Sequence, residues 1–270
     1  MSLLSPLSDQ YAVFIIDHAT AHDDVSQWYQ HDLDNPPMHI AVLAGTEYQH
    51  LAGVGPQLLY TQVESELFDL ARTQIEQTEE GVVFYTQAPF SDVCCWARQA
   101  VSVTTEHGRA LCRFFEVGFL NSAEQVLGEQ RFWQHLYPIS GFSVYQDGVW
   151  SRTQPSLALA ALQSEAVLLI TQRESDQLTQ LRERRFYEGL ARAYEAHIPA
   201  VNPVDWVQSQ CQLATAYGFD TQYLNEQWLR AAIQYGETFY QHEAINGYLE
   251  QKTLTPQRRW QSIESVLTAS

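Results

Sequence analysis

The sequence predicts an α+β protein in which an N-terminal mixed α/β lobe is followed by a C-terminal all-helical lobe. Short runs of β-branched and aromatic residues, typical of strands, recur through residues 1–155. From about Glu174 onward, apolar residues instead repeat at the three- and four-residue spacing of amphipathic helices. We expect a linker near 151–165, where the sequence SRTQPS carries turn residues, and therefore domains at 1–155 and 156–270.

Strands and helices are expected to alternate in the first lobe. Apolar runs predict strands at 11–16, 39–43, 57–62, 81–86, 101–105, 110–115, 142–145 and 149–152. Helical spacing and helix-start residues predict helices at 23–30, 65–77, 90–99 and 122–136. The last of these helices is predicted to begin at a cap formed by Asn121 or Ser122. His107-Gly108 and Asp147-Gly148 are typical of hairpin turns.

The second lobe is expected to be a small helical bundle. Apolar spacing predicts helices at 174–197, 205–217, 220–235, 244–249 and 256–267. Pro199 and Pro203 interrupt the pattern after the first helix, and Gly218 and Gly236 end the next two.

The chain is strongly acidic, with a formal net charge of −17. Residues 1–155 contain 19 acidic and 6 basic residues, whereas residues 156–270 contain 13 and 9. Nucleic-acid binding depends on clustered Lys and Arg, and an anionic membrane surface repels an acidic protein. We therefore expect neither nucleic acid nor membrane as a partner, whereas a basic or apolar surface of another protein is compatible with the charge.

The sequence favours a cytoplasmic location. The N-terminus, MSLLSPLSDQ, lacks the basic and apolar regions of a signal peptide, and no apolar run reaches the length of a membrane span. A chain of this length needs no disulfide bonds, so we expect reduced thiols at all four cysteines, Cys94, Cys95, Cys112 and Cys211.

A polar cluster at the end of the first predicted strand is a candidate metal site. His18 and His22 are four residues apart, and Asp17, Asp23 and Asp24 adjoin them. Histidines at this spacing on a helix can share a metal ion, as they do in metal-dependent hydrolases. The cluster lacks the His-Glu-x-x-His pattern, however, and a loop with capping aspartates explains the same residues. We therefore expect no metal and no cofactor, with the hydrolase as an alternative.

Other catalytic motifs are weak. Gly53-Val54-Gly55-Pro56 predicts a turn rather than a phosphate loop, because a proline and a strand follow it. A Cys-His pair can form only in the folded chain, and Cys94, Cys95 and Cys112 lie in apolar runs that disfavour the reactive thiolate. We expect a protein that is not an enzyme.

The order of segments in the first lobe carries a family resemblance. Its marks are a strand ending at Asp17, His39–Thr46, Gly55–Leu59, Gly81–Thr86 with Pro89, Trp96–Gln99, Gly108–Glu116, and Gln130–Trp133 leading to Pro138. Ala214–Phe219 and Tyr235–Phe239 add to it in the second lobe. These segments resemble the adaptor, or chaperone, family of type VI secretion systems, often called Tap or TEC and long catalogued as a domain of unknown function. The resemblance covers roughly residues 10–150.

The resemblance implies a specific role. Such adaptors bind a toxic effector in the cytoplasm and help to load it onto the VgrG spike, sometimes through a PAAR tip protein, without being secreted. The implied partners are therefore a cognate effector, through its N-terminal segment, and a VgrG or PAAR protein. The family usually shows Arg-Phe-Tyr-Asp-Pro where this chain has Arg113–Val117, so the resemblance does not define the exact cargo surface or the cargo.

Partner-binding residues are expected among the charged and aromatic side chains of the first lobe. Arg109, Arg113 and Glu116 fit either a recognition surface or a structural ion pair. Aromatic residues serve both in cores and as binding hot spots. The predicted partner-binding set is Arg109, Arg113, Phe115, Glu116, Trp133, Tyr137 and Trp150. A further alternative is an acidic immunity protein that blocks a toxin by charge mimicry.

Overall fold

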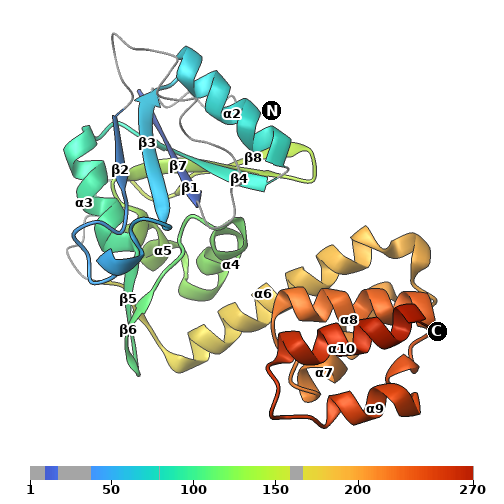
Figure 1. The fold of residues 1–270 in the computed structure, drawn as a ribbon. Helices are drawn as coiled ribbons and strands as arrows, with labels where there is room; N and C mark the ends of the chain where they lie inside the picture. Colours follow the sequence, from blue (N-terminus) through green and yellow to red (C-terminus); the bar gives the residue numbers. More distant parts are fainter. Residues whose placement is uncertain (1–9, 18–37, 79, 159–166, 270) are drawn as a thin grey trace. The chain divides into compact units, whose positions relative to one another are not determined.

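The computed structural model describes residues 10–17, 38–78, 80–158 and 167–269 (Figure 1). The chain divides into two compact units, Met1–Thr179 and Gln180–Ser270. Unit 1 is a sheet with helices and unit 2 contains helices, so the α+β fold is confirmed. Within the described ranges, every helix is too short or too polar to cross a membrane.

Unit 1 is built on a six-stranded antiparallel sheet with the strand order β2-β3-β1-β4-β7-β8. In β1, alternate side chains point to opposite faces, and both faces are covered, so Ala12, Val13 and Phe14 are all buried. This two-sided burial explains why β1 is apolar throughout rather than alternating. The strands are β1 Tyr11–Asp17, β2 Met38–Ala41, β3 Pro56–Gln62, β4 Glu80–Thr86, β7 Ile139–Gln146 and β8 Val149–Thr153.

Helices cover both faces of this sheet (Figure 1). The larger core lies between one face and three helices, α3 Phe90–Ala100, α4 Val117–Leu127 and α5 Glu129–Leu136. On the other face, α2 Glu66–Thr78 packs Phe68, Ala71 and Ile75 against the strands. Gly81 permits this close packing, since a Cβ atom there would lie 2.6 Å from the Cγ2 atom of Ile75.

A second, three-stranded sheet has the order β6-β5-β9. The predicted hairpin forms its antiparallel half, with β5 Ser102–Thr105 and β6 Gly108–Leu111. The two-residue strand β9, Leu169–Ile170, was not predicted and pairs in parallel with β5. Residues 169–170 therefore still belong to a sheet of unit 1, beyond residue 155, where the sequence predicts the end of the first domain.

Two predictions in unit 1 are wrong. The predicted strand 110–115 ends at Leu111, and the predicted helix 122–136 is two helices, α4 and α5, separated by Gly128. Gly128 has φ 80° and ψ 150°, a conformation that favours glycine and interrupts a helix. Ser122 is no cap, because it lies buried inside α4, where its hydroxyl donates to the carbonyl of Gly118. The predicted helix 23–30 lies outside the described residues.

Unit 2 is a bundle around Trp228, which is fully buried. Asn202 and Thr221 cap α7 and α8 with their side chains, and Pro203 occupies the first turn of α7, where a proline is tolerated. The elements after β9 are α6 Gln172–Ala193, η3 Glu195–His197, α7 Pro203–Ala216, α8 Gln222–Tyr235, η4 Phe239–Gln241, α9 Glu243–Leu249 and α10 Pro256–Ala269.

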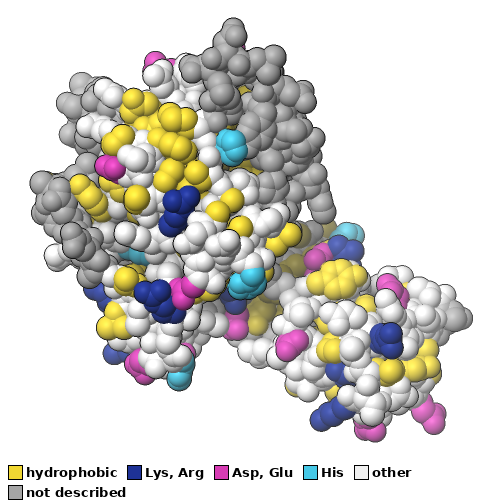
Figure 2. Space-filling model, turned by 60° about the vertical axis from the view of Figure 1, so that its left-hand side comes forward, with side chains coloured by type: hydrophobic (Ala, Val, Ile, Leu, Met, Phe, Trp, Pro, Cys, Tyr) yellow, Lys and Arg dark blue, Asp and Glu magenta, His cyan; other side chains and the backbone are white. Residues whose placement is uncertain are grey.

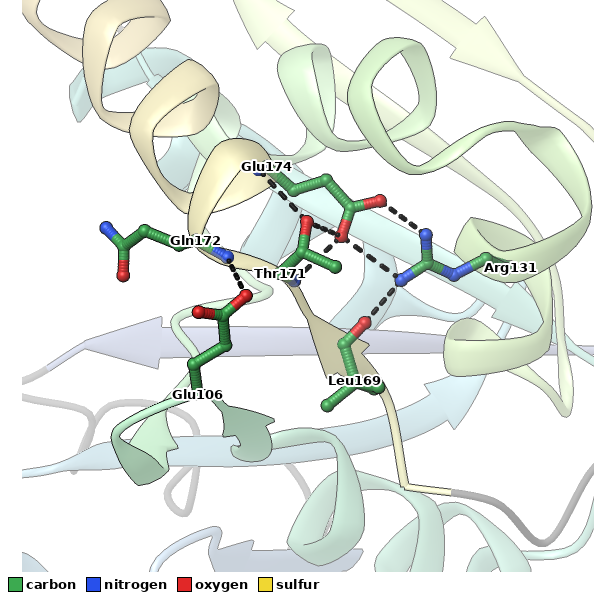
Figure 3. A network of polar contacts seen from close by, with 6 residues as sticks. All are labelled: Glu106, Arg131, Leu169, Thr171, Gln172 and Glu174. Atoms are coloured by element: carbon green, nitrogen blue, oxygen red, sulfur yellow. Dashed lines mark hydrogen bonds and ion pairs between the residues drawn. The ribbon is translucent and has the colours of Figure 1, made fainter.

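The boundary between the compact units falls inside α6, whereas the sequence predicted a boundary at 155. Figure 3 shows what holds the first turn of α6 in unit 1. Arg131 of α5 donates to both carboxylate oxygens of Glu174 and to the Leu169 carbonyl. Thr171 and Glu174 exchange side-chain and backbone hydrogen bonds as a capping box. The carboxylate of Glu106 also accepts from the Gln172 backbone amide.

Candidate protein-binding surface

The β5–β6 hairpin presents Arg109 on the surface of unit 1. Its guanidinium donates to Glu47 at 3.4 Å, and the same carboxylate oxygen accepts a hydrogen bond from Ser102 at 2.7 Å. The Arg109 side chain is 59% exposed, so this ion pair adds at most about 1 kcal/mol to stability. Arg109 is thus accessible to a partner, and Glu47 limits its orientation.

Arg113, Phe115 and Glu116 form one group after the end of β6. The Arg113 guanidinium lies 2.8 Å from the Glu116 carboxylate, and both side chains are partly exposed. The guanidinium also lies over the Phe115 ring, 5.9 Å from its centre. Phe115 itself is 9% exposed, because its ring packs against Phe114 in the core. The group therefore offers mainly the ion pair to a partner.

Trp133 is a core residue, which corrects its assignment as a partner-binding residue. It is fully buried, stacks on Phe142 and donates its indole N–H to Glu124 at 3.2 Å. Since no part of the ring reaches the surface of the folded protein, it cannot contact a partner directly. Tyr137, in the peptide before Pro138, is partly buried and packs against the same core.

Trp150 lies on the other side of the sheet from these residues. It packs in the core beneath α2, donates its indole N–H to Glu76 and has the Arg72 guanidinium 5.0 Å above its ring. Arg113 and Tyr137 belong to the opposite side, where α3, α4 and α5 pack. The predicted set therefore does not form one surface.

The residues predicted for a metal site, His18, His22, Asp23 and Asp24, lie outside the described residues. Asp17 ends β1. Across the described ranges, no three His, Cys, Asp or Glu side chains gather closely enough to hold a metal ion.

The fold does bring one cysteine beside a histidine. The sulfur atom of Cys112 lies 3.9 Å from Nε2 of His135. Burial raises the pKa of Cys112 to about 12, and burial lowers the pKa of His135 to about 4. Both groups are therefore uncharged at neutral pH, and an uncharged buried thiol is a poor nucleophile. The pair is a structural contact of the core. Cys95, in contrast, is exposed on α3.

A feature missed in the sequence is an apolar surface along the edge strand β2, which we call the β2 patch. Tyr60 stacks on Tyr11 at 4.7 Å and contacts Phe90 at 5.5 Å, and Met38 is the neighbour of Tyr60 across the β2–β3 pairing. Met38 is 47% exposed. Figure 2 shows hydrophobic side chains gathered on this side of unit 1. At the surface the patch consists of the exposed Met38 with the partly buried Tyr11, Ile40 and Phe90, and the buried Tyr60, 3% exposed, lies beneath them.

A second missed feature is a groove of about 490 Å³ between α4, the start of α5 and the β7–β8 hairpin. We call it the α4–β7 groove. Asn121, Glu124 and Gln125 line it at the three- and four-residue spacing of one helix face, a signal visible in the sequence. Because the sequence assigned these residues to the cap and first turn of one long helix, their shared face was not recognised. The remaining lining residues are Leu120, Glu129, Phe142 and Thr153.

Comparison with known proteins adds one finding. No curated protein and no solved structure shows a significant match to this chain. Residues 11–133, which include β1 to β6, α4 and most of α5, match the family model described as a domain of unknown function, DUF4123.

Proposed function

We propose that this protein is an adaptor that binds a type VI secretion effector in the cytoplasm and helps to load it onto the VgrG spike, directly or through a PAAR protein. The observation that carries the proposal is the β2 patch. Clustered aromatic and apolar side chains at a surface are typical of protein-binding sites, where a few such residues supply most of the affinity.

Two further observations support the proposal. The match to an uncharacterised domain at 11–133 falls within the span over which the segment order resembles type VI adaptors. The excess of 19 acidic over 6 basic residues in 1–155 suits a partner with a basic surface, since opposite charge accelerates encounter.

The first experiment is co-expression with the effector and spike proteins encoded beside this gene, followed by size-exclusion chromatography. We expect a stable complex with the effector that is lost when the N-terminal segment of the effector is deleted. Deleting the adaptor gene should abolish delivery of that effector and leave other effectors unaffected. Protection from a toxin without any secretion defect would instead identify an immunity protein, and failure to bind either neighbour would overturn the proposal.

The β2 patch is tested by Met38→Asp. A charge at this exposed position should weaken effector binding at least about tenfold, because it must be desolvated against an apolar partner surface. Val149→Asp is the matched control, since Met38 and Val149 are both exposed first residues of the two outer strands of the main sheet. Calorimetry measures both affinities, and an equal effect of the two changes would remove the β2 patch from the binding site.

A further inference from the structure

We infer that the α4–β7 groove receives an arginine side chain of the partner protein, an inference that rests on the adaptor function proposed above. The groove has a volume of about 490 Å³, which lies in the usual range of about 300–1,000 Å³ for ligand sites. Leu120 and Phe142 line it with apolar surface, and each is only 2% exposed. The groove therefore has an apolar base fixed by the main core of unit 1.

Two carboxylates give the groove its charge. Glu124 belongs to α4 and Glu129 begins α5. Within the part of the chain that the structure describes, neither is paired with an arginine or lysine. In most of the other carboxylate contacts of unit 1 an arginine is the partner, as for Glu47, Glu116 and Glu174. The groove thus carries negative charge that the described residues of its own chain leave unbalanced.

Both carboxylates are also held in position. The buried indole N–H of Trp133 donates to one oxygen of Glu124, and among the described residues nothing donates to its other oxygen. The Ser156 backbone amide donates to Glu129, and the hydrogen bonds from Ser156 lower the pKa of that carboxyl. Fixed acceptors lose little entropy when a donor arrives, so the site is prepared for a cation.

Arginine fits this arrangement better than lysine. The aliphatic stem of an arginine can lie on apolar surface while its charged end reaches polar groups. Its planar guanidinium has five N–H donors, a number that matches the acceptor oxygens of Glu124, Glu129 and Gln125 that line the groove. A lysine ammonium is a single point with three donors and is more strongly hydrated.

A direct test follows the indole N–H resonance of Trp133 by NMR in the full-length protein. Loss of one indole signal in Trp133→Phe assigns it. Titration with Nα-acetyl-arginine amide should shift this resonance saturably, because the cation competes for the Glu124 carboxylate. Nα-acetyl-citrulline amide, which has nearly the same shape without the charge, should not. No shift with the arginine compound, or an equal shift with both, would overturn the inference.

Charge-neutral variants test whether the arginine-dependent shift of the Trp133 resonance arises from the two carboxylates of the groove. Glu124→Gln with Glu129→Gln keeps an acceptor oxygen for Trp133 and Ser156 while it removes both charges, so the fold should be retained. The control, Glu66→Gln with Glu264→Gln, removes two charges from exposed helix positions outside the groove. The arginine-dependent shift should vanish in the first variant and persist in the second. Persistence in both would contradict a role for the groove.

Effector binding then links the groove to the proposed function. The groove variant should bind the effector about tenfold or more weakly than the control variant. Equal affinities would overturn the inference while the adaptor function stands. If the wild-type chain binds no effector, the adaptor proposal fails, and the arginine titration still decides whether the groove accepts the side chain.

Discussion

His135 gives the core of unit 1 a specific dependence on pH. Burial lowers the pKa of His135 to about 4, whereas an exposed histidine has a pKa near about 6.5. Between these values the unfolded chain binds a proton that the folded chain does not. The free energy of unfolding should therefore fall as the pH drops from about 6.5 to about 4, by up to about 3 kcal/mol, and be fully recovered above that range.

The control for this prediction is a second histidine. His135→Gln removes the titrating group, so the difference in unfolding free energy between wild type and variant should change across this pH range. His50→Gln changes an exposed histidine of the short 3-10 helix η1, Gln49–Leu51, and serves as the control, for which we expect the same pH profile as in the wild type. Urea denaturation at a series of pH values measures all three proteins, and parallel profiles for wild type and His135→Gln would refute the assignment.

Arg259 is a buried charged residue in the core of unit 2. It is 5% exposed, donates to the carbonyls of Tyr217 and Leu249, and lies over the Phe219 ring at 4.8 Å. One terminal nitrogen of Arg259 donates to both carbonyls, and the other donates to the carbonyl of Gly218. Arg259→Lys would lose this second nitrogen and the planar guanidinium over the Phe219 ring. We expect it to lower the free energy of unfolding by about 2–3 kcal/mol, as measured by denaturant titration.

The neighbouring residue is a matched control for Arg259. Arg258 is exposed on the same helix, so Arg258→Lys should change stability by less than about 0.5 kcal/mol. Equal losses in the two variants would show that the carbonyl contacts contribute little.

At the scale of elements, the start of α6 depends on Glu174. Hydrogen bonds from Arg131 lower the pKa of Glu174, against the opposing effect of burial, so the carboxylate stays charged at neutral pH. Glu174→Ala removes both this ion pair and the capping box. We expect a loss of about 1–3 kcal/mol and faster hydrogen exchange at residues 167–176.

A second glutamate of α6 provides the comparison for Glu174. Glu188 pairs with Arg184 on the exposed surface, four residues apart. Glu188→Ala should cost no more than about 0.5 kcal/mol and should leave hydrogen exchange at the start of α6 unchanged. An equal effect of the two variants on that exchange would contradict the proposed role of Glu174.

Elements with a strong local pattern could be predicted, and those defined by distant partners could not. The apolar run of β1 and the helical spacing of α2 and α8 are properties of neighbouring residues, and the structure places these elements close to the predicted ranges. β9 is only two residues long and exists through its pairing with β5, about 65 residues earlier, so no local signal marks it. The break at Gly128 was missed, although Leu127 and Phe132 are five residues apart and so interrupt the three- and four-residue apolar spacing of a helix.

At the scale of the molecule, the net charge of −17 should govern how fast a partner is found. Salt screens the attraction between opposite charges. The Debye length, over which this attraction decays, is about 10 Å at 0.1 M ionic strength. If the effector surface is basic, raising the salt from about 50 to about 500 mM should slow association by about tenfold or more and change dissociation much less. Surface plasmon resonance measures both rates, and an unchanged association rate would exclude electrostatic steering.

The candidate binding surface was the least predictable part of the molecule. Residue type identified Arg109 and Arg113 as exposed, since charged side chains are rarely buried. It did not distinguish Trp133, which is in the core, from Trp150, which lies on the other side of the sheet. That distinction depends on strand register and on which helix covers which face, and both arise from contacts between distant segments.

The position of the unit boundary inside α6 restricts where unit 2 can be exchanged for that of another protein in a chimaera. A chimaera joined at residue 155 would take β9 and the capping residues of α6 from a different parent than Arg131 and Glu106, and their contacts would have to match by chance. A joint near Arg182–Arg184, where α6 is exposed, keeps those contacts within one parent. The exchange would still need an equal number of residues, since one inserted residue turns the following side chains by about 100° around the helix axis.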